Sequence, residues 1–240
     1  MINNDVLSDP EIRRFGNQIA LPQIGIEGQV KLKRARVCVV GAGGLGSVVL
    51  QHLAATGVGY VGIIDYSLVE ETDIQRQTLY GGNDMGKLKT IISKQHLQNL
   101  FPLIDFEIIN LKLTQDNADR IVQPFDMVID ATNDGNSHQV IGNACKSLGM
   151  TWIFGSIQDF TGEVAVIDRN CHVNYDILKQ NFNNGSEHQS KGTLALAYCF
   201  IGTLMALEAL KSLVGNSESL ANKILSVNLL SYQFNVKSFI

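Results

Sequence analysis

The hydrophobic positions of the chain fall into short apolar runs that alternate with helical patterns. Residues 36–40 (R-V-C-V-V) and 60–65 (Y-V-G-I-I-D) are β-branched runs, typical of parallel strands buried on both faces. Between them, apolar residues at positions 45, 48, 49, 53 and 54 mark one face of a helix. Further strands are predicted at 106–109, 127–130, 151–155, 162–168, 224–229 and 232–237, and helices at 87–100, 115–122, 137–148 and 193–214, with two short helices within 10–33.

Repeated strand and helix units of this length predict an α/β fold of the Rossmann type. Its central sheet is mostly parallel, with right-handed crossovers and helices on both faces. The last two strands, joined tightly at residues 230–231, add an antiparallel part, and the polar stretch 169–191 is expected to be a loop. Without repeats, low-complexity tracts or a linker, residues 1–240 are interpreted as one domain.

Composition narrows the classes of function. The 19 basic and 23 acidic residues give a net charge of −4, which argues against a nucleic-acid partner. No apolar run approaches the ~20 residues that a membrane span needs, so no membrane segment is expected. Four cysteines without a C-x-x-C pair fit a reducing, cytoplasmic setting, and those at positions 38, 145 and 199 are expected to be buried thiols.

The segment V-V-G-A-G-G-L-G-S (residues 39–47) carries the first candidate chemistry. Gly41 permits a tight turn, Gly43 lets a phosphate approach the backbone, and Gly46 lets helix and strand pack closely. The helix N-terminus offers unpaired N–H groups to phosphates, and Asp65 ends the next strand where a carboxylate meets ribose hydroxyls. This site suits a redox dinucleotide or ATP, and a glycine turn needed only for packing is the remaining alternative.

The residues beyond Asp65 favour ATP. T-D-I-Q-R-Q (residues 72–77) places Arg76 beyond the strand, and G-K-L-K (residues 86–89) places cations at a helix start, where the helix dipole disfavours them. Arg76 and Lys89 therefore predict a polyphosphate ligand, whereas Lys87 is interpreted as a solvated surface lysine. The histidines form no evident constellation, so nothing supports the substrate site that a hydride enzyme needs.

These motifs together resemble a family. The order R-F-x-x-Q, G-x-G-G-L-G-S, D-I-Q-R-Q, G-K-L-K and D-A-T-N-D resembles the ThiF/MoeB/HesA proteins, bacterial relatives of ubiquitin-activating enzymes, over nearly the whole chain. The resemblance implies a homodimer that uses MgATP to adenylate the C-terminal carboxylate of a small ubiquitin-like sulfur carrier ending in Gly-Gly, for thiamine or molybdopterin synthesis. It implies nucleotide contacts from the following residues: Gly41, Gly43, Gly44, Gly46, Asp65, Arg76, Gln77, Lys89 and Asn133.

Several positions depart from the family pattern. Asn17 stands where the family has an arginine that reaches the ATP of the partner subunit. This cation is missing here unless Arg13 or Arg14 takes its place. The family's T-D-N is Thr132-Asn133-Asp134 here, and Asp73 takes the place of an asparagine. Because Mg²⁺ prefers oxygen ligands, including one or two carboxylates, we expect the magnesium carboxylate to have moved to Asp73 or Asp134. The predicted catalytic residues are therefore Arg76, Lys89, Asp73 and Asp134.

Two further family features are missing. Of the cysteine pairs that hold zinc in many relatives only Cys171 remains, so no zinc site is expected. His188 stands at the position of the loop cysteine, so sulfur would have to come from a partner's persulfide. Adenylation alone is therefore the leading hypothesis. The alternatives are a catalytically impaired nucleotide-binding protein that docks a carrier or serves as a non-catalytic subunit, and, more remotely, a dehydrogenase.

Overall fold

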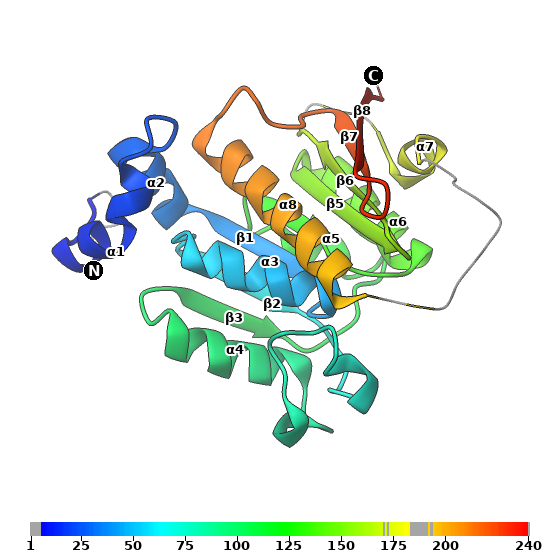
Figure 1. Ribbon diagram of the computed structural model, residues 1–240, viewed down its shortest axis with the longest axis horizontal. Helices are drawn as coiled ribbons and strands as arrows, with labels where there is room; N and C mark the ends of the chain where they lie inside the picture. Colours follow the sequence, from blue (N-terminus) through cyan, green and yellow to red (C-terminus); the bar gives the residue numbers. More distant parts are fainter. Residues whose placement is uncertain (1–5, 170, 172, 183–191, 193, 240) are drawn as a thin grey trace.

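A single eight-stranded sheet organises the molecule (Figure 1). The computed structural model describes residues 6–169, 171, 173–182, 192 and 194–239. The strand order is β3-β2-β1-β4-β5-β6-β7-β8; the first five strands along the chain pair in parallel and the last three antiparallel, which confirms the predicted fold class. The strands are β1(Arg36–Val40), β2(Tyr60–Ile64), β3(Asp105–Ile109), β4(Met127–Asp130), β5(Thr151–Gln158), β6(Thr161–Ile167), β7(Lys223–Asn228) and β8(Gln233–Ser238).

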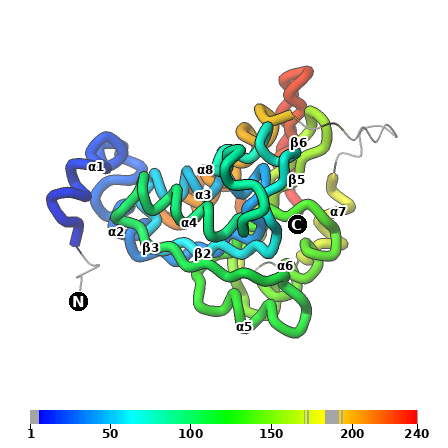
Figure 2. Tube along the Cα trace, turned by 90° about the horizontal axis from the view of Figure 1, so that it is seen from below, coloured from blue at the N-terminus to red at the C-terminus, as the bar shows by residue number. Residues whose placement is uncertain are grey.

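Helices cover both faces of the sheet. Figure 2 shows α3, α4 and α8 on one side of the strands and α5 and α6 on the other. The helices are α1(Asp9–Ile19), α2(Gly25–Arg34), α3(Gly44–Ala55), α4(Lys89–Leu100), α5(Ala118–Val122), α6(Gly135–Leu148), α7(Tyr175–Gln180) and α8(Ala195–Val214), with short 3-10 turns η1(Glu71–Asp73) and η2(Gly82–Asp84).

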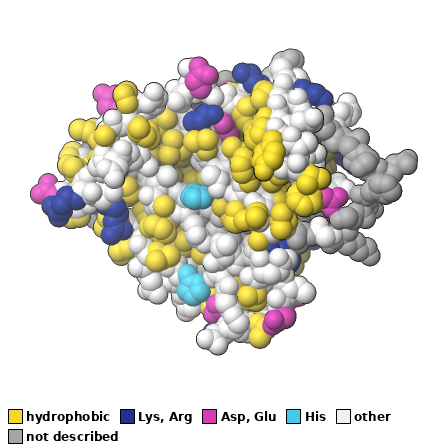
Figure 3. All heavy atoms as spheres, in the orientation of Figure 1, with side chains coloured by type: hydrophobic (Ala, Val, Ile, Leu, Met, Phe, Trp, Pro, Cys, Tyr) yellow, Lys and Arg dark blue, Asp and Glu magenta, His cyan; other side chains and the backbone are white. Residues whose placement is uncertain are grey.

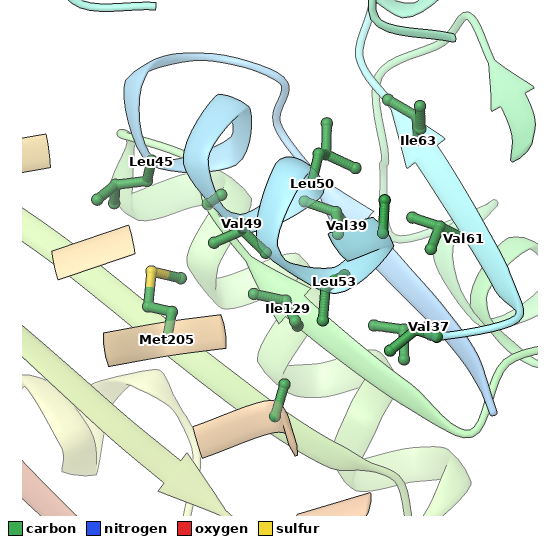
Figure 4. Close-up of a cluster of buried hydrophobic side chains, with 14 of the residues drawn as sticks. Val37, Val39, Leu45, Val49, Leu50, Leu53, Val61, Ile63, Ile129 and Met205 are labelled. Carbon is green, nitrogen blue, oxygen red and sulfur yellow. The ribbon is translucent and has the colours of Figure 1, made fainter. Parts of the chain in front are cut away.

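Alternating side chains of the central strands build two cores. Val37 and Val39 point to one face, where they pack against α3 residues such as Leu53 (Figure 4). Cys38 and Val40 point to the other face, toward α6. Strands that are apolar on both faces need such a double cover, and this packing fixes the positions of the strand ends that carry the site.

The long helix predicted at 193–214 is α8, Ala195–Val214, and it corrects only the statement that no apolar run approaches 20 residues. By length and composition alone it is apolar enough to cross a membrane, because Glu208 and Lys211 are the only charged residues among its 20. The helix packs on α3 and β5 through buried residues such as Ile201 and Met205. Its most apolar 18 residues are nevertheless only 44% buried, so apolar side chains of α8 also lie on the surface.

Two local predictions were also wrong. The stretch 169–191 contains the helix α7, whose N-cap Asn174 accepts a hydrogen bond from the Ile177 N–H at 3.1 Å. A six-residue helix is too short to show a helical period, which explains the error. Residues 183–191 lie outside the described part of the chain. Cys38 and Cys145 are buried as predicted, whereas Cys199 is only half-buried.

Candidate functional site

A cavity of about 380 Å³ opens at the carboxyl ends of β1 and β4. β1 lies between β2 and β4, and both pairings are parallel. The chain adds β2 and β3 on one side of β1 and then β4 and β5 on the other, so the order of the strands reverses at this point. Such a switch point is where open α/β sheets bind ligands. The glycine turn, the loop after β2, the start of α4 and the turn after β4 all line the cavity.

The glycine turn has the predicted geometry. Gly41 has a φ of +94°, and a Cβ there would lie 2.7 Å from the Ala131 carbonyl oxygen. A Cβ on Gly46 would run into the Gly41 carbonyl, so this position requires close backbone contact. Gly43 lines the cavity, where a Cβ would lie 3.8 Å from Gln77 Nε2, and α3 begins at Gly44 without a side-chain cap. The first N–H groups of α3 and the positive end of its dipole are thus available to phosphates.

Asp65 follows β2, the strand next to β1, and its carboxylate contacts the glycine turn. Its Oδ2 accepts the Ala42 N–H at 2.8 Å and its Oδ1 accepts the Ser67 N–H at 2.7 Å. The half-buried carboxylate is thereby oriented, and each oxygen retains a lone pair. This arrangement suits hydroxyl donors such as those of a ribose.

Asp73 joins the two predicted cations. Its Oδ2 lies 2.9 Å from Lys89 Nζ, and its Oδ1 lies 3.1 Å from an Arg76 guanidinium nitrogen. Oδ1 also accepts the Gln77 Nε2–H at 2.6 Å, and Oδ2 accepts the Glu70 N–H at 3.1 Å. Four donors fill the lone-pair positions of a carboxylate, and the pair with Lys89 is buried. The structure thus brings four predicted site residues together and leaves the buried Gln77 Oε1 without a partner among the described residues.

The turn after β4 forms the opposite wall. Asn133 and Asp134 are exposed and line the cavity. Asp134 is the N-cap of α6, and its two oxygens accept the Ser137 N–H at 2.9 Å and the Ser137 hydroxyl at 2.6 Å. Burial raises the pKa of Asp134, but the bonds from Ser137 outweigh it and the net pKa is lowered. Asp134 is therefore an ionised carboxylate that faces the cavity with lone pairs to spare.

The structure adds a buried pair that the sequence analysis missed. Asp130, at the end of β4, is fully buried, and its Oδ2 lies 2.8 Å from Nδ1 of His138. His138 is only 5% exposed and lines the cavity. The histidines were predicted to form no constellation, and His138 corrects that prediction. A strand-end aspartate eight residues before a histidine, at a predicted helix start, was the available signal.

Tyr198 of α8 is a second cavity residue that was missed. Its ring packs against Gly44, where a Cβ would lie 2.6 Å from the ring. Burial raises its pKa, and the nearby Arg76 partly offsets this effect. Nothing in the local sequence of α8 indicates this contact, because 154 residues separate Gly44 from Tyr198.

Other predicted positions lie away from the cavity. Lys87 pairs with Asp84 at 3.6 Å and is exposed, as interpreted. Arg13, Arg14 and Asn17 are exposed on α1, and no described residue of α1 lines this cavity. Among the described residues, no three His, Cys, Asp or Glu side chains come together as a metal cluster. The position of His188 falls outside the described residues.

The fold and the site define an α/β protein whose sheet carries a glycine turn and a pair of cations at the wall of one cavity. A family comparison makes this class specific, because the ThiF family model matches residues 15–239. The chain belongs to the ThiF family. This result confirms the family resemblance found in the sequence.

The sequence relatives agree with this assignment, and two solved structures share the fold. A sulfur carrier protein adenylyltransferase of Thermus thermophilus is 37% identical over 232 residues, covering 93% of this chain and 86% of the relative. An adenylyltransferase and sulfurtransferase MOCS3 of Culex quinquefasciatus is 36% identical over 222 residues; the alignment covers 91% of this chain but only 51% of that relative's length. The crystal structure of PaaA shares the fold with a TM-score of 0.82 at 20% identity, and the match covers 98% of this chain and 75% of that one. The crystal structure of E. coli MccB with ATP shares it with a TM-score of 0.72 at 20% identity, covering 89% of this chain and 66% of that one.

Proposed function

We propose that this chain uses ATP to adenylate the C-terminal carboxylate of a small ubiquitin-like sulfur carrier protein, of the thiamine or molybdopterin type. The observation that carries the proposal is the cluster of Arg76 and Lys89 around Asp73, beside a glycine turn and a free helix N-terminus. Two cations at the wall of one cavity suit a reaction in which negative charge develops on leaving phosphates. The names of the relatives support the same activity.

The reaction follows from positions and charges. A carboxylate oxygen of the carrier attacks the α-phosphorus of ATP, and the bond from that phosphorus to the bridging oxygen breaks, so that pyrophosphate leaves. The α3 N-terminus and the two cations stabilise the negative charge that develops on the phosphates, and Asp65 orients the ribose. Positioning and electrostatics suffice, and no protein nucleophile is required.

Magnesium, which the family implies, fits one of the two predicted carboxylates better than the other. The Asp73 oxygens are filled by four donors, two of them cationic. The exposed Asp134 has free lone pairs at the cavity, and Mg²⁺ commonly takes one carboxylate with phosphates and water. We assign Asp134 as the residue that would hold the ion, which would neutralise phosphate charge, and Asp73 as the residue that positions Arg76 and Lys89.

A comparison of two variants tests this assignment. Asp134→Asn keeps a good N-cap but should raise the Mg²⁺ concentration needed for half-maximal pyrophosphate release. Asp73→Asn should leave that concentration unchanged even though it lowers the rate. An equal Mg²⁺ requirement in both variants would contradict the assignment.

Pyrophosphate release tests the function itself. We expect release to require both ATP and a carrier ending in Gly-Gly, and to stop when the last glycine of the carrier is removed or its carboxylate is amidated. Binding of ATP and carrier without release would instead support a non-catalytic carrier-docking protein. The replacement of Arg76 by methionine should abolish release while ATP still binds.

The C-terminal hairpin offers a surface for the body of the carrier. Leu230, Tyr232, Phe234 and Val236, here called the hairpin patch, are all more than half exposed, and Figure 3 shows hydrophobic side chains gathered over this region and the adjoining end of α8. Across the sheet, Ile157 of the cavity is in register with Gly162, Val227 and Phe234. Three strand spacings are about 14 Å, which about four extended residues bridge. A partner with an apolar face and an extended C-terminal tail fits this arrangement.

Two exposed leucines give a matched test of the hairpin patch. Leu230 is 71% exposed in the patch, and Leu100 is 62% exposed at the end of α4. Leu230→Glu should raise the KM for the carrier about tenfold or more without changing ATP affinity, whereas Leu100→Glu should change neither. Equal effects of the two substitutions would contradict carrier docking there.

We further propose that two copies of the chain associate through α8. This apolar helix exposes Leu207 at 46%, and the residues of α1 that the family places at a partner's ATP do not line this chain's own cavity. Sedimentation should show a dimer that Leu207→Glu dissociates and Leu103→Glu, a 42% exposed control, does not.

The four free thiols support a reducing, cytoplasmic setting.

A further inference from the structure

Asp130 and His138 form a buried polar unit at the wall of the cavity. The Asp130 Oδ1 accepts the Thr132 hydroxyl at 2.7 Å and the Thr132 N–H at 3.1 Å, and Oδ2 faces His138 Nδ1 at 2.8 Å. A buried ionisable pair is not needed for stability, since apolar residues of similar volume serve a core as well or better. The pair therefore calls for a functional explanation.

The place of the pair in the fold ties it to the nucleotide. Asp130 pairs in register with Val40, the residue before the glycine turn, and the Ala131 N–H donates to the Val40 carbonyl at 2.9 Å. The phosphate-facing turn and the turn that bears Thr132 are thus held against each other. On the sheet, Asp65 marks the β2 side of the cavity and His138 marks the β4 side.

The ring of His138 has one edge committed and one edge free. Nδ1 lies 2.8 Å from Asp130 Oδ2 and 3.1 Å from the Thr132 hydroxyl, so the polar contacts of the ring engage this nitrogen. Because His138 lines the cavity, Nε2 is the ring nitrogen left for a ligand. Nε2 has no hydrogen-bond partner among the described residues. Phe154 packs edge-on at 4.9 Å and Tyr175 lies at 5.1 Å, and these two rings lie 6.1 Å from each other, so the imidazole is one member of an aromatic cluster that holds its orientation.

The charge of the ring suits an anion. Burial lowers the pKa of His138, but the charge of Asp130, its hydrogen bond and the charge of Asp134 outweigh burial, and the net pKa is raised. A ring whose Nδ1–H is held by a carboxylate and whose Nε2–H faces the cavity is a directed donor. It lies across the cavity from the cluster around Asp73, which already accounts for the polyphosphate.

We propose that His138, oriented by Asp130, binds the carboxylate that attacks ATP, so that the cavity has separate cationic groups for the leaving and the attacking partner. This inference rests on the proposed adenylation for its biological meaning. The binding of a terminal carboxylate at His138 Nε2 can be measured without any turnover.

A binding experiment tests the inference directly. The full chain, with 15N-labelled histidine and AMP present, is titrated with an acetylated peptide ending in Gly-Gly as the free carboxylate, and with the same peptide as its amide. We expect the Nε2 resonance of His138 to shift with the carboxylate alone, and that of His96, outside the cavity, to stay in place. An unshifted His138 resonance, or an equal shift with the amide, would overturn the proposal.

Kinetics of the carrier reaction separate substrate binding from a merely structural role. His138→Asn should raise the KM for the carrier about tenfold or more and leave ATP affinity within about twofold, while His96→Gln changes neither. Added imidazole should restore part of the activity of His138→Gly. Equal losses of ATP and carrier affinity, without rescue, would show that the pair only supports the turn. Should no variant or parent chain release pyrophosphate, the proposed function fails while the resonance experiment still decides the role of His138.

Discussion

Asp73 offers the sharpest perturbation of the site, because one carboxylate neutralises two cations. Asp73→Asn keeps the size of the side chain and removes its charge, so that Arg76 and Lys89 face each other uncompensated. Breaking a buried pair costs about 3–5 kcal/mol of unfolding free energy. We expect about 3 kcal/mol, the lower end of that range, because Arg76 is half-exposed and an asparagine oxygen still accepts a hydrogen bond.

The same substitution should make the site a better receptor for free polyphosphate. ATP without Mg²⁺ brings the negative charge that the variant lacks, and recovery of half the lost stability corresponds to about tenfold tighter binding, since 1.4 kcal/mol is tenfold. Urea unfolding with and without ATP, together with calorimetric titration of ATP in the presence of a chelator, measures both quantities.

Asp134→Asn serves as the control, because asparagine also caps helices well. It should change the unfolding free energy by only a few tenths of a kcal/mol. If Asp73→Asn were as stable as the parent chain, or bound free ATP more weakly, the assignment of Asp73 as the counterion of the two cations would be refuted.

Two further substitutions probe the scaffold of the site. Gly46→Ala drives a Cβ into the Gly41 carbonyl and should lower the unfolding free energy by about 1–3 kcal/mol or more; Gly82→Ala, with open space around it, should be nearly neutral in the same urea titration. The raised pKa of His138 gives a pH dependence of definite sign. The stabilisation by Asp130 is fully present below the ordinary histidine pKa of about 6.5 and is lost as pH rises through the raised folded-state value. The difference in unfolding free energy between the parent chain and His138→Gln should therefore shrink from pH 6 to pH 9. A difference that widens would contradict a stabilising ion pair between His138 and Asp130.

Local patterns were sufficient for the framework of the fold. Buried strands such as β1 are continuous β-branched runs, and the positions of Gly41 and Gly46 follow from backbone geometry within six residues. Helix α8 was predicted to within two residues of its bounds, and its two charged residues, Glu208 and Lys211, pair with each other. That residues 1–240 make one domain stays a prediction.

The site was predictable only where its chemistry lies in one motif. Arg76 and Lys89 stood out as cations near a strand end and a helix start, but their convergence on Asp73 depends on how η1 meets α4. The spacing of Asp130 and His138, a strand end eight residues before a histidine at a helix start, was an available signal, but their contact also depends on the turn between β4 and α6. Packing sets the contacts between elements that lie far apart in the sequence. These contacts, and not the motifs, determine how the site residues lie relative to one another.

Exchange of labelled pyrophosphate into ATP tests the central claim most directly, since it reports reversible formation of the acyl-adenylate. The account predicts exchange that requires a carrier with a free C-terminal glycine carboxylate and that is lost in Arg76→Met and Lys89→Met. Exchange without a carrier, or a chain that binds ATP and carrier yet exchanges no label, would contradict it.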